Sequence, residues 1–313
     1  MISLLGKLLK VIPKDIDPDK AYVIVSPHVG DIYAFCSLSK EVKQLYNLKK
    51  IVLITPKKFH QLVSCFKDID EVTEISDSLA EFFAWLPLSH PLKLQPLKSG
   101  SLNICSPGLF EKLFFFNGYN FWHVFRLKMG IQDRLKFKLI PDFPEASSDV
   151  IKLKNEYEGH QKKLFIFPLA RAIKTTKEIK SVFRQVVETA LSNGWIIFAN
   201  DIPDYLSDMP LIPARFSLID TIHFANFAGN VLTIRSGITD LLTNASAKIA
   251  VLYPNLKTTH LFGKTTIKDY FPVSDFEMRA VMQEFTISES VEQIAKEIIR
   301  FFQLEFKDKS DVT

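Results

Sequence analysis

A turn with the residue types of an anion site lies at residues 235–237. An apolar run at 231–234 stops at Arg235, Ser236 and Gly237, and Asp240 follows one helical turn later. A guanidinium binds phosphate oxygens bidentately, and the N–H groups at a helix N-terminus add further donors. The pattern predicts that Arg235, Ser236 and Gly237 bind a phosphate or diphosphate, while Asp240 accepts hydrogen bonds from hydroxyl groups of the same ligand or fixes Arg235. The alternative is an internal Arg235–Asp240 ion pair that only shapes the turn, and both can hold together.

A candidate catalytic carboxylate follows the first apolar run of the chain, at 21–26. The segment continues through His28 and Gly30 to Asp31, where a helix is expected to begin. A general base needs a carboxylate within hydrogen-bond reach of the hydroxyl that it deprotonates, and Asp31 qualifies by its position. His28 is the second candidate, either to contact a substrate or to share the proton. The alternatives are a helix cap for Asp31 and a loop histidine without a role.

Basic residues follow another apolar run, at 164–167. Arg171 and Lys174 lie in the loop after it and Lys177 lies just beyond. A fixed cation in such a loop stabilises a leaving diphosphate, which gains negative charge in the transition state. We predict this role for Arg171 and Lys174, and a solvated position for Lys177.

The elements that must hold these residues alternate between strand and helix. Strands are expected at 21–26, 51–55, 164–167, 195–199, 231–234 and 249–253, with weaker candidates at 72–75 and 102–105; helical spacing is clearest at 179–191 and 290–302. The Pro-, Ser- and charge-rich stretch 140–163 is the expected linker. The fold class is therefore α/β, with two Rossmann-like domains at 1–150 and 151–313 facing a central cleft.

Composition excludes several classes of protein. The net charge of +4 over 313 residues comes without a basic stripe, which argues against a nucleic-acid partner. The three cysteines are isolated, so neither a zinc site nor a disulfide scaffold is expected, and a reducing cytoplasm suits them. Two Asp-x-Asp pairs, at 15–17 and 68–70, do not directly follow a strand, so no metal site is predicted.

A membrane-spanning segment is not expected, because no run approaches the ~18 apolar residues that one requires. Residues 1–14 are apolar and basic at helical spacing. They predict a first helix packed on its own domain or, as the alternative, a peripheral contact with the inner membrane.

The order of these landmarks resembles bacterial heptosyltransferases, sugar-nucleotide transferases of the GT-B fold. The matching phrases are AYVIVSPHVGDIYAFCSL, KIVLITPKKF, LFIFPLARAIKTTK and SLIDTIHFANFAGNVLTIRSGITDLL. One departure is important: where the family's donor turn has Asp and later His, this chain has Arg235 and Asp240. The contacts to the donor must therefore differ, and ADP-heptose as the donor does not follow.

The resemblance implies a glycosyltransferase that moves a sugar from a nucleotide-diphosphate donor to a glycan or lipid-linked acceptor. It implies inversion at the anomeric carbon, no cofactor and no metal, Asp31 as the base in an acceptor-side loop with Gly30, and a cytoplasmic role in lipopolysaccharide or capsule synthesis. Two alternatives remain: a nucleotide-sugar epimerase of the same architecture and a non-catalytic nucleotide-binding protein.

Overall fold

The structure, a computed structural model, describes residues 16–85, 97–105, 120–131, 135–170, 173, 175–255, 257–260, 263–287 and 290–304. Residues 1–15, with the predicted first helix or membrane contact, lie outside this set, as do Arg171 and Lys174. None of the described helices is both long and apolar enough to cross a membrane.

The chain divides into two compact units that do not coincide with two halves of the sequence. The first unit combines Met1–Pro144 with Lys257–Glu277, and the second combines Glu145–Leu256 with Met278–Thr313. The chain therefore passes from one unit to the other three times. The predicted domains, 1–150 and 151–313, differ from these units in the position of the first boundary and in the segment Lys257–Glu277.

The first unit is built on a parallel sheet of four strands in the order β3-β2-β1-β4. Its elements are β1 (Lys20–Val25), α2 (Val29–Ser37), α3 (Ser39–Leu45), β2 (Lys50–Thr55), α4 (His60–Val63), β3 (Glu71–Glu74), α5 (Asp77–Trp85), β4 (Ser101–Cys105) and α7 (Phe121–Lys128). The segment Lys257–Glu277 adds the hairpin β10 (Lys257–His260) and β11 (Gly263–Thr266), and then α12 (Ile267–Tyr270).

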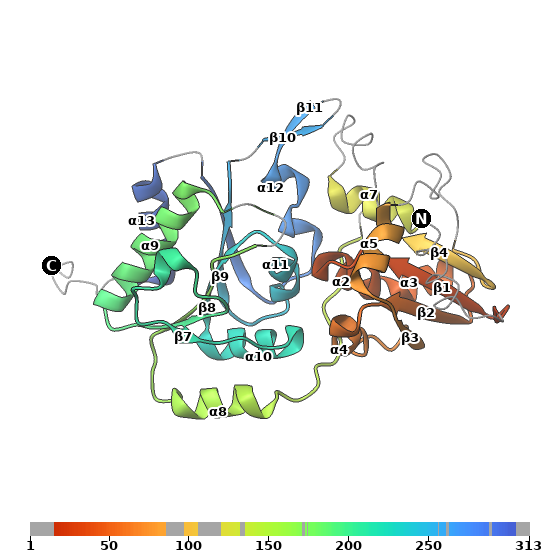
Figure 1. Cartoon of the computed structure of the whole chain (residues 1–313), viewed down its shortest axis with the longest axis horizontal. Coiled ribbons are helices and arrows are strands. Elements are labelled where there is room, and N and C mark those ends of the chain that lie inside the picture. The colour runs from red at the N-terminus through yellow and green to blue at the C-terminus, as the bar shows by residue number, and fades with distance from the viewer. Residues whose placement is uncertain are drawn as a thin grey trace. The chain divides into compact units, whose positions relative to one another are not determined.

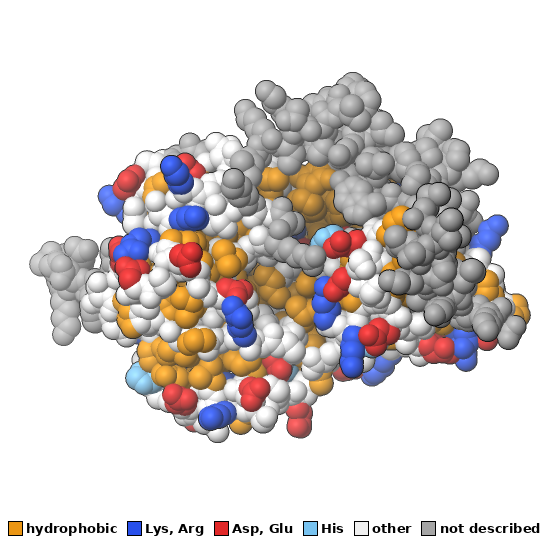
Figure 2. All heavy atoms as spheres, viewed as in Figure 1, with side chains coloured by type: hydrophobic (Ala, Val, Ile, Leu, Met, Phe, Trp, Pro, Cys, Tyr) orange, Lys and Arg blue, Asp and Glu red, His pale blue; other side chains and the backbone are white. Residues whose placement is uncertain are grey.

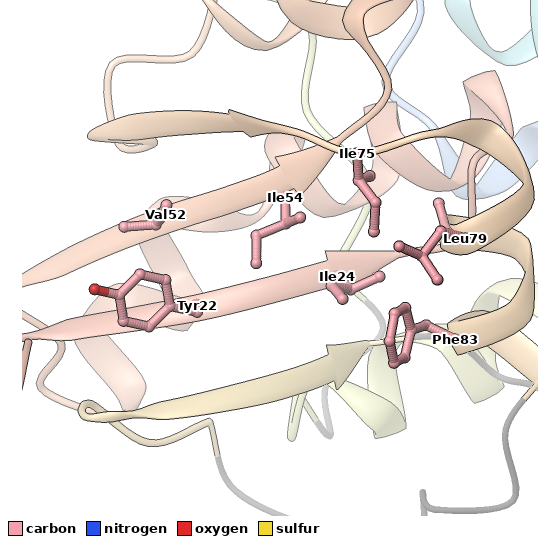
Figure 3. Close-up of a cluster of buried hydrophobic side chains, with 8 residues drawn as sticks. Tyr22, Ile24, Val52, Ile54, Ile75, Leu79 and Phe83 are labelled. Carbon is pink, nitrogen blue, oxygen red and sulfur yellow. The ribbon is translucent and has the colours of Figure 1, made fainter. Parts of the chain in front are cut away.

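Helices cover both faces of this sheet at its central strands β1 and β2, which are continuous apolar runs. α2 packs on β1 and also contacts α3 and α4, whereas α5 packs on β1 and β4. Figure 3 shows part of the core, in which side chains of β1, β2 and α5 meet; it comprises Tyr22, Ile24, Val52, Ile54, Ile75, Leu79, Ala80 and Phe83.

The second unit has a parallel sheet of six strands in the order β12-β9-β8-β5-β6-β7. Its elements are α8 (Ser148–Glu156), β5 (Lys163–Phe167), α9 (Lys177–Ser192), β6 (Ile196–Ala199), β7 (Ile212–Pro213), α10 (Leu218–Ala228), β8 (Asn230–Ile234), α11 (Gly237–Leu242), β9 (Lys248–Tyr253), β12 (Val281–Thr286) and α13 (Val291–Phe302). α9 and α13 pack together on one face, and α10, α11 and α8 lie on the other (Figure 1).

Local sequence explains where the helices of the second unit begin and end. Ser217 caps α10 by accepting a hydrogen bond from the Asp220 amide. Gly229 ends the same helix in the left-handed conformation, with φ of 74°. Gly194, also at φ of 74°, follows α9 before β6. These stops fix where β6 and β8 begin.

Candidate active site

Both sheets share one strand order, and it fixes where a ligand is expected. In each unit, the strand that comes first along the chain lies between the second and the fourth strands. The chain therefore adds its second and third strands on one side of the first strand and its fourth strand on the other side. In such sheets ligands bind beyond the carboxyl ends of the strands at this switch point. The switch point lies between β1 and β4 in the first unit and between β5 and β8 in the second.

The predicted residues follow these strands. Gly30 and Asp31 lie in the first turn of α2, the helix that follows β1, and the turn that begins at Arg235 comes directly after β8. Arg171 and Lys174 belong to the loop after β5, but they lie outside the described residues. Topology therefore supports all the predicted loops, although it does not test the role of any side chain.

Asp31 lies in the first turn of α2 and is 8% exposed. His28 is the N-cap residue of this helix, but its side chain makes no capping hydrogen bond. The His28 Nδ1 atom lies 2.6 Å from the Ser26 hydroxyl and 3.8 Å from Asp31 Oδ2. The structure thus brings the two predicted catalytic residues together, with a hydroxyl orienting the imidazole beside a largely buried carboxylate.

Lys128 was missed in the sequence, although the structure brings it close to this site. Burial raises the pKa of Cys105, at the end of β4, to about 12; Lys128 counteracts this rise and the charge of Asp31 adds to it. Burial also lowers the pKa of Lys128, which ends α7. The charges of Lys128 and Asp31 thus both act on Cys105, and nothing in the local sequence indicates this.

In the second unit, Arg235 and Asp240 form a buried ion pair. Arg235 donates to Asp240 Oδ1 over 2.7 Å, and each side chain is 2% exposed. A second guanidinium N–H of Arg235 donates to the Ser236 carbonyl. Burial is the largest single effect on the pKa of Arg235 and lowers it, but the charge and hydrogen bond of Asp240, with the charges of Tyr253 and Glu284, together hold that pKa above its usual value. The alternative left open by the sequence, an internal pair that shapes the turn, is therefore realised.

The backbone of the turn is used differently from the prediction. The Ser236 amide donates to the Thr239 hydroxyl over 3.1 Å, so it does not face outward toward an anion. The buried Ser236 hydroxyl has no hydrogen-bond partner among the described residues. A phosphate at this turn would therefore bind through the Ser236 hydroxyl and the Gly237 amide, the first of α11.

A second polar pair lies beside the Arg235–Asp240 pair. Tyr253, at the end of β9, donates its hydroxyl to Glu284 of β12 over 2.5 Å. Burial raises the pKa of Tyr253, and the charge of Arg235 counteracts this rise. Glu284 was not a candidate in the sequence, because β12 is polar and half-exposed and gives a weak strand signal. Polar side chains from α11, β9 and β12 thus surround Arg235 at the turn after β8.

Two contacts fix the loops on the other side of this switch point. The Tyr205 hydroxyl donates to the carbonyl of Pro168, the residue after β5, over 3.0 Å. Beyond β6, Arg215 donates to the Asn200 carbonyl over 3.0 Å and pairs with Asp201. Asp201 is a further carboxylate at the carboxyl edge of the sheet that the sequence analysis did not single out.

The second Asp-x-Asp pair has a structural role. Asp70 accepts from Lys43 through both carboxylate oxygens, at 2.9 and 2.8 Å, and from the Ile51 amide at 2.7 Å.

Within the described part of the chain, no group of three or more His, Cys, Asp or Glu side chains could hold a metal ion. On the face seen in Figure 2, basic and acidic side chains alternate without a patch of one sign.

The comparisons with known proteins show the fold. No protein-family model matches the chain, and no curated protein matches it. Among solved structures, ADP-heptose lipopolysaccharide heptosyltransferase II of E. coli is 12% identical, with a TM-score of 0.54, over 91% of this chain and 98% of the other. A family 9 glycosyl transferase of Veillonella parvula is 13% identical, also with a TM-score of 0.54, over 93% and 99%. The iron-containing dodecameric glycosyltransferase TibC of enterotoxigenic E. coli is 9% identical, with a TM-score of 0.50, over 91% and 77%. The chain thus has the two-domain α/β fold of these glycosyltransferases over nearly its whole length.

Proposed function

We propose that the protein is a glycosyltransferase that moves a sugar from a nucleoside diphosphate donor to a hydroxyl of a glycan or lipid-linked acceptor. One observation carries the proposal: a heptosyltransferase fold in which the predicted base and the predicted donor turn both follow switch-point strands. Fold alone does not assign chemistry, so the side chains at these two positions carry the argument.

The second unit is the proposed donor site. Its turn offers the Ser236 hydroxyl and the Gly237 amide, and the buried Arg235–Asp240 pair fixes the turn from behind. Fixed donors of this kind stabilise a leaving diphosphate, because they need not reorganise as charge develops on it. Arg171 and Lys174, in the loop after β5, complete the proposed donor set.

The first unit supplies the proposed base. Asp31 takes the proton of the acceptor hydroxyl while the oxygen of that hydroxyl bonds to the anomeric carbon of the donor sugar. The bond from the anomeric carbon to the diphosphate breaks at the same time. The nucleoside diphosphate leaves with the bonding electron pair, and direct attack inverts the anomeric centre. His28, beside Asp31, orients the acceptor or shares the proton.

The setting we propose is the cytoplasmic synthesis of a bacterial surface glycan such as lipopolysaccharide or capsule. Support comes from the name of the E. coli neighbour, a lipopolysaccharide heptosyltransferase that is named for ADP-heptose. ADP sugars are therefore the first donors to test, although Arg235 and Asp240 at the turn make other nucleotides equally worth screening.

The test combines binding with turnover. Calorimetry against a panel of nucleoside diphosphates identifies the donor nucleotide, and release of that nucleotide from its sugar measures transfer or donor hydrolysis. Asp31→Asn keeps the size of the side chain but removes the proton acceptor. Because a general base contributes a factor of about 10²–10⁴, turnover should fall by that order while nucleotide affinity stays constant.

Asp220→Asn is the matched control. Asp220 is 6% exposed, lies in the first turn of a helix and accepts from the Ser147 amide, so it resembles Asp31 in burial and position but lies in the other unit. The Asp220→Asn variant should be less stable than the wild type but should turn over at the wild-type rate per folded molecule. A protein that binds no nucleoside diphosphate, or an Asp31→Asn variant as active as the wild type, would contradict the proposed function.

A further inference from the structure

The segment Lys257–Glu277 is encoded in the C-terminal half of the chain but belongs to the unit that carries Asp31. Its anchor is Asp275. One carboxylate oxygen accepts from Arg126 over 2.6 Å, and the other accepts from the Asn120 side chain over 2.8 Å. Arg126 is 2% exposed and also donates to the Leu135 carbonyl. A buried, hydrogen-bonded ion pair therefore ties this segment to α7.

The next residue, Phe276, extends the attachment into the core. It is fully buried and forms a parallel bridge with Phe137, in which the Phe137 amide donates to the Asp275 carbonyl and the Glu277 amide donates to the Phe137 carbonyl. The Trp122 ring packs edge-on against Phe276, with centroids 5.0 Å apart. Backbone and side chain thus fix this ring in one position.

Phe276 meets the helix that carries Asp31. The Tyr33 ring, on α2 two residues after Asp31, stacks on Phe276 with centroids 5.6 Å apart and planes 16° apart. The Tyr33 hydroxyl donates to the Lys138 carbonyl over 2.8 Å, next to Phe137. Phe276 therefore holds the face of the Tyr33 ring, and the Lys138 carbonyl holds its hydroxyl.

α2 depends on such packing for its orientation. It has nine residues, a length at which isolated helices are marginal, and His28 supplies no side-chain cap. From Gly30 to Ser37 every residue is buried, so tertiary contacts set the position of the helix. A misplacement of about 1 Å at a reacting group can cost on the order of a hundredfold in rate.

We infer that Phe276 and Tyr33 are positioning residues for Asp31: a segment from the C-terminal half of the chain sets the orientation of the helix that carries the base. This inference rests on the proposed function and deepens it, because it says what holds the base in place. Neither residue needs to touch the substrate.

The test is a cycle of variants. Phe276→Leu removes the stacked ring, and Tyr33→Phe removes only the hydroxyl that binds Lys138. Each should lower kcat, by about tenfold to a hundredfold for Phe276→Leu and less for Tyr33→Phe, while nucleoside diphosphate affinity stays constant. In the Asp31→Asn background, neither substitution should lower kcat further, because both act through the lost carboxylate.

Phe83→Leu is the matched control. Phe83 is 2% exposed and belongs to the core cluster with α5 in the same unit, so the substitution removes a buried ring of equal size. It should lose stability and keep its kcat. Equal losses of kcat in Phe83→Leu and Phe276→Leu, or losses that multiply with Asp31→Asn, would overturn the inference and leave the proposed function standing.

The remaining outcomes are also decisive. If Phe276→Leu does not fold, Tyr33→Phe decides, and a wild-type kcat in that variant overturns the inference. If Asp31→Asn itself turns over normally, the base assignment fails and the positioning role fails with it.

Discussion

Replacing Arg235 by Met should strongly destabilise the second unit. The substitution leaves Asp240, which is 2% exposed, without the guanidinium that holds its carboxylate at 2.7 Å. Breaking one partner of a buried ion pair costs about 3–5 kcal/mol, because the other charge stays buried and uncompensated. At an m-value of about 2 kcal/mol/M, the urea midpoint of this unit falls by about 1.5–2.5 M.

The double variant Arg235→Met with Asp240→Leu separates the pair from the turn. Apolar residues of similar volume often replace a buried pair at no net cost, so the double variant should recover most of the lost stability. Hydrogen exchange of the β8 and β9 amides in urea follows this unit selectively. Wild-type stability in the single variant, or no recovery in the double variant, would refute the reasoning.

The same double variant tests the role of Arg235 in binding, by calorimetry with a nucleoside diphosphate. If Arg235 fixes the turn or contacts the diphosphate, binding should be weaker by about 1.5–3 kcal/mol even after stability has recovered, as expected for a lost charge-assisted hydrogen bond. Wild-type affinity in a stable double variant would reduce Arg235 to a purely structural residue.

Three further results are expected. Burial is the largest single effect on the pKa of Asp70 and raises it, but the hydrogen bonds from Lys43 and the Ile51 amide and the charges of Lys43 and Lys50 together lower that pKa. Asp70→Asn should therefore cost up to about 1 kcal/mol at pH 6 and progressively less as the pH falls through the folded-state pKa. A cost that does not change with pH in urea titrations would contradict this. Burial raises the pKa of Cys65 to about 11 and of Cys105 to about 12, and that of Cys36 as well. With about one Cys65 thiol in a thousand ionised at pH 8, a thiol reagent should label the native protein slowly and the urea-unfolded protein at once; rapid native labelling would be the opposite result. Transfer or donor hydrolysis should persist in excess EDTA, and a loss that manganese or magnesium restores would move the chain to another mechanism.

Strand positions and helix ends were largely accessible from the sequence, because they depend on local patterns. Apolar runs bounded by polar turns predicted β1, β2, β5, β8 and β9, and helical spacing predicted α9 and α13. The ends of the helices also have local causes, in the Ser217 cap and in the left-handed Gly194 and Gly229. The strand β12 was missed: its sequence, VMQEFT, alternates weakly, and Val281 is 62% exposed. An exposed edge strand lacks the apolar run that identifies its buried neighbours.

The candidate site was predictable only where one turn carries it. Arg235 and Asp240 are close in sequence, so their pairing could be weighed in advance, whereas the Tyr253–Glu284 bond joins residues 31 apart on different strands. The position of Lys128 beside Cys105 depends on how α7 packs against the sheet, and no local pattern records it. Contacts between residues far apart in the sequence depend on tertiary packing, and local sequence patterns do not show which of these residues meet.

The three passages of the chain between the units have a consequence for protein synthesis. Asp275, the ion-pair partner of Arg126, is synthesised 149 residues after it. At a synthesis rate of about 5–20 residues per second, the ion pair can form only on the order of ten seconds after Arg126 is made. Until then a guanidinium and the Phe137 face that receives Phe276 lack their partners. The second unit waits even longer, because β12 and α13 follow that segment. The first unit therefore cannot complete its folding before Glu277 is made, nor the second before α13 is made, and a fragment cut at residue 144 should fold incompletely.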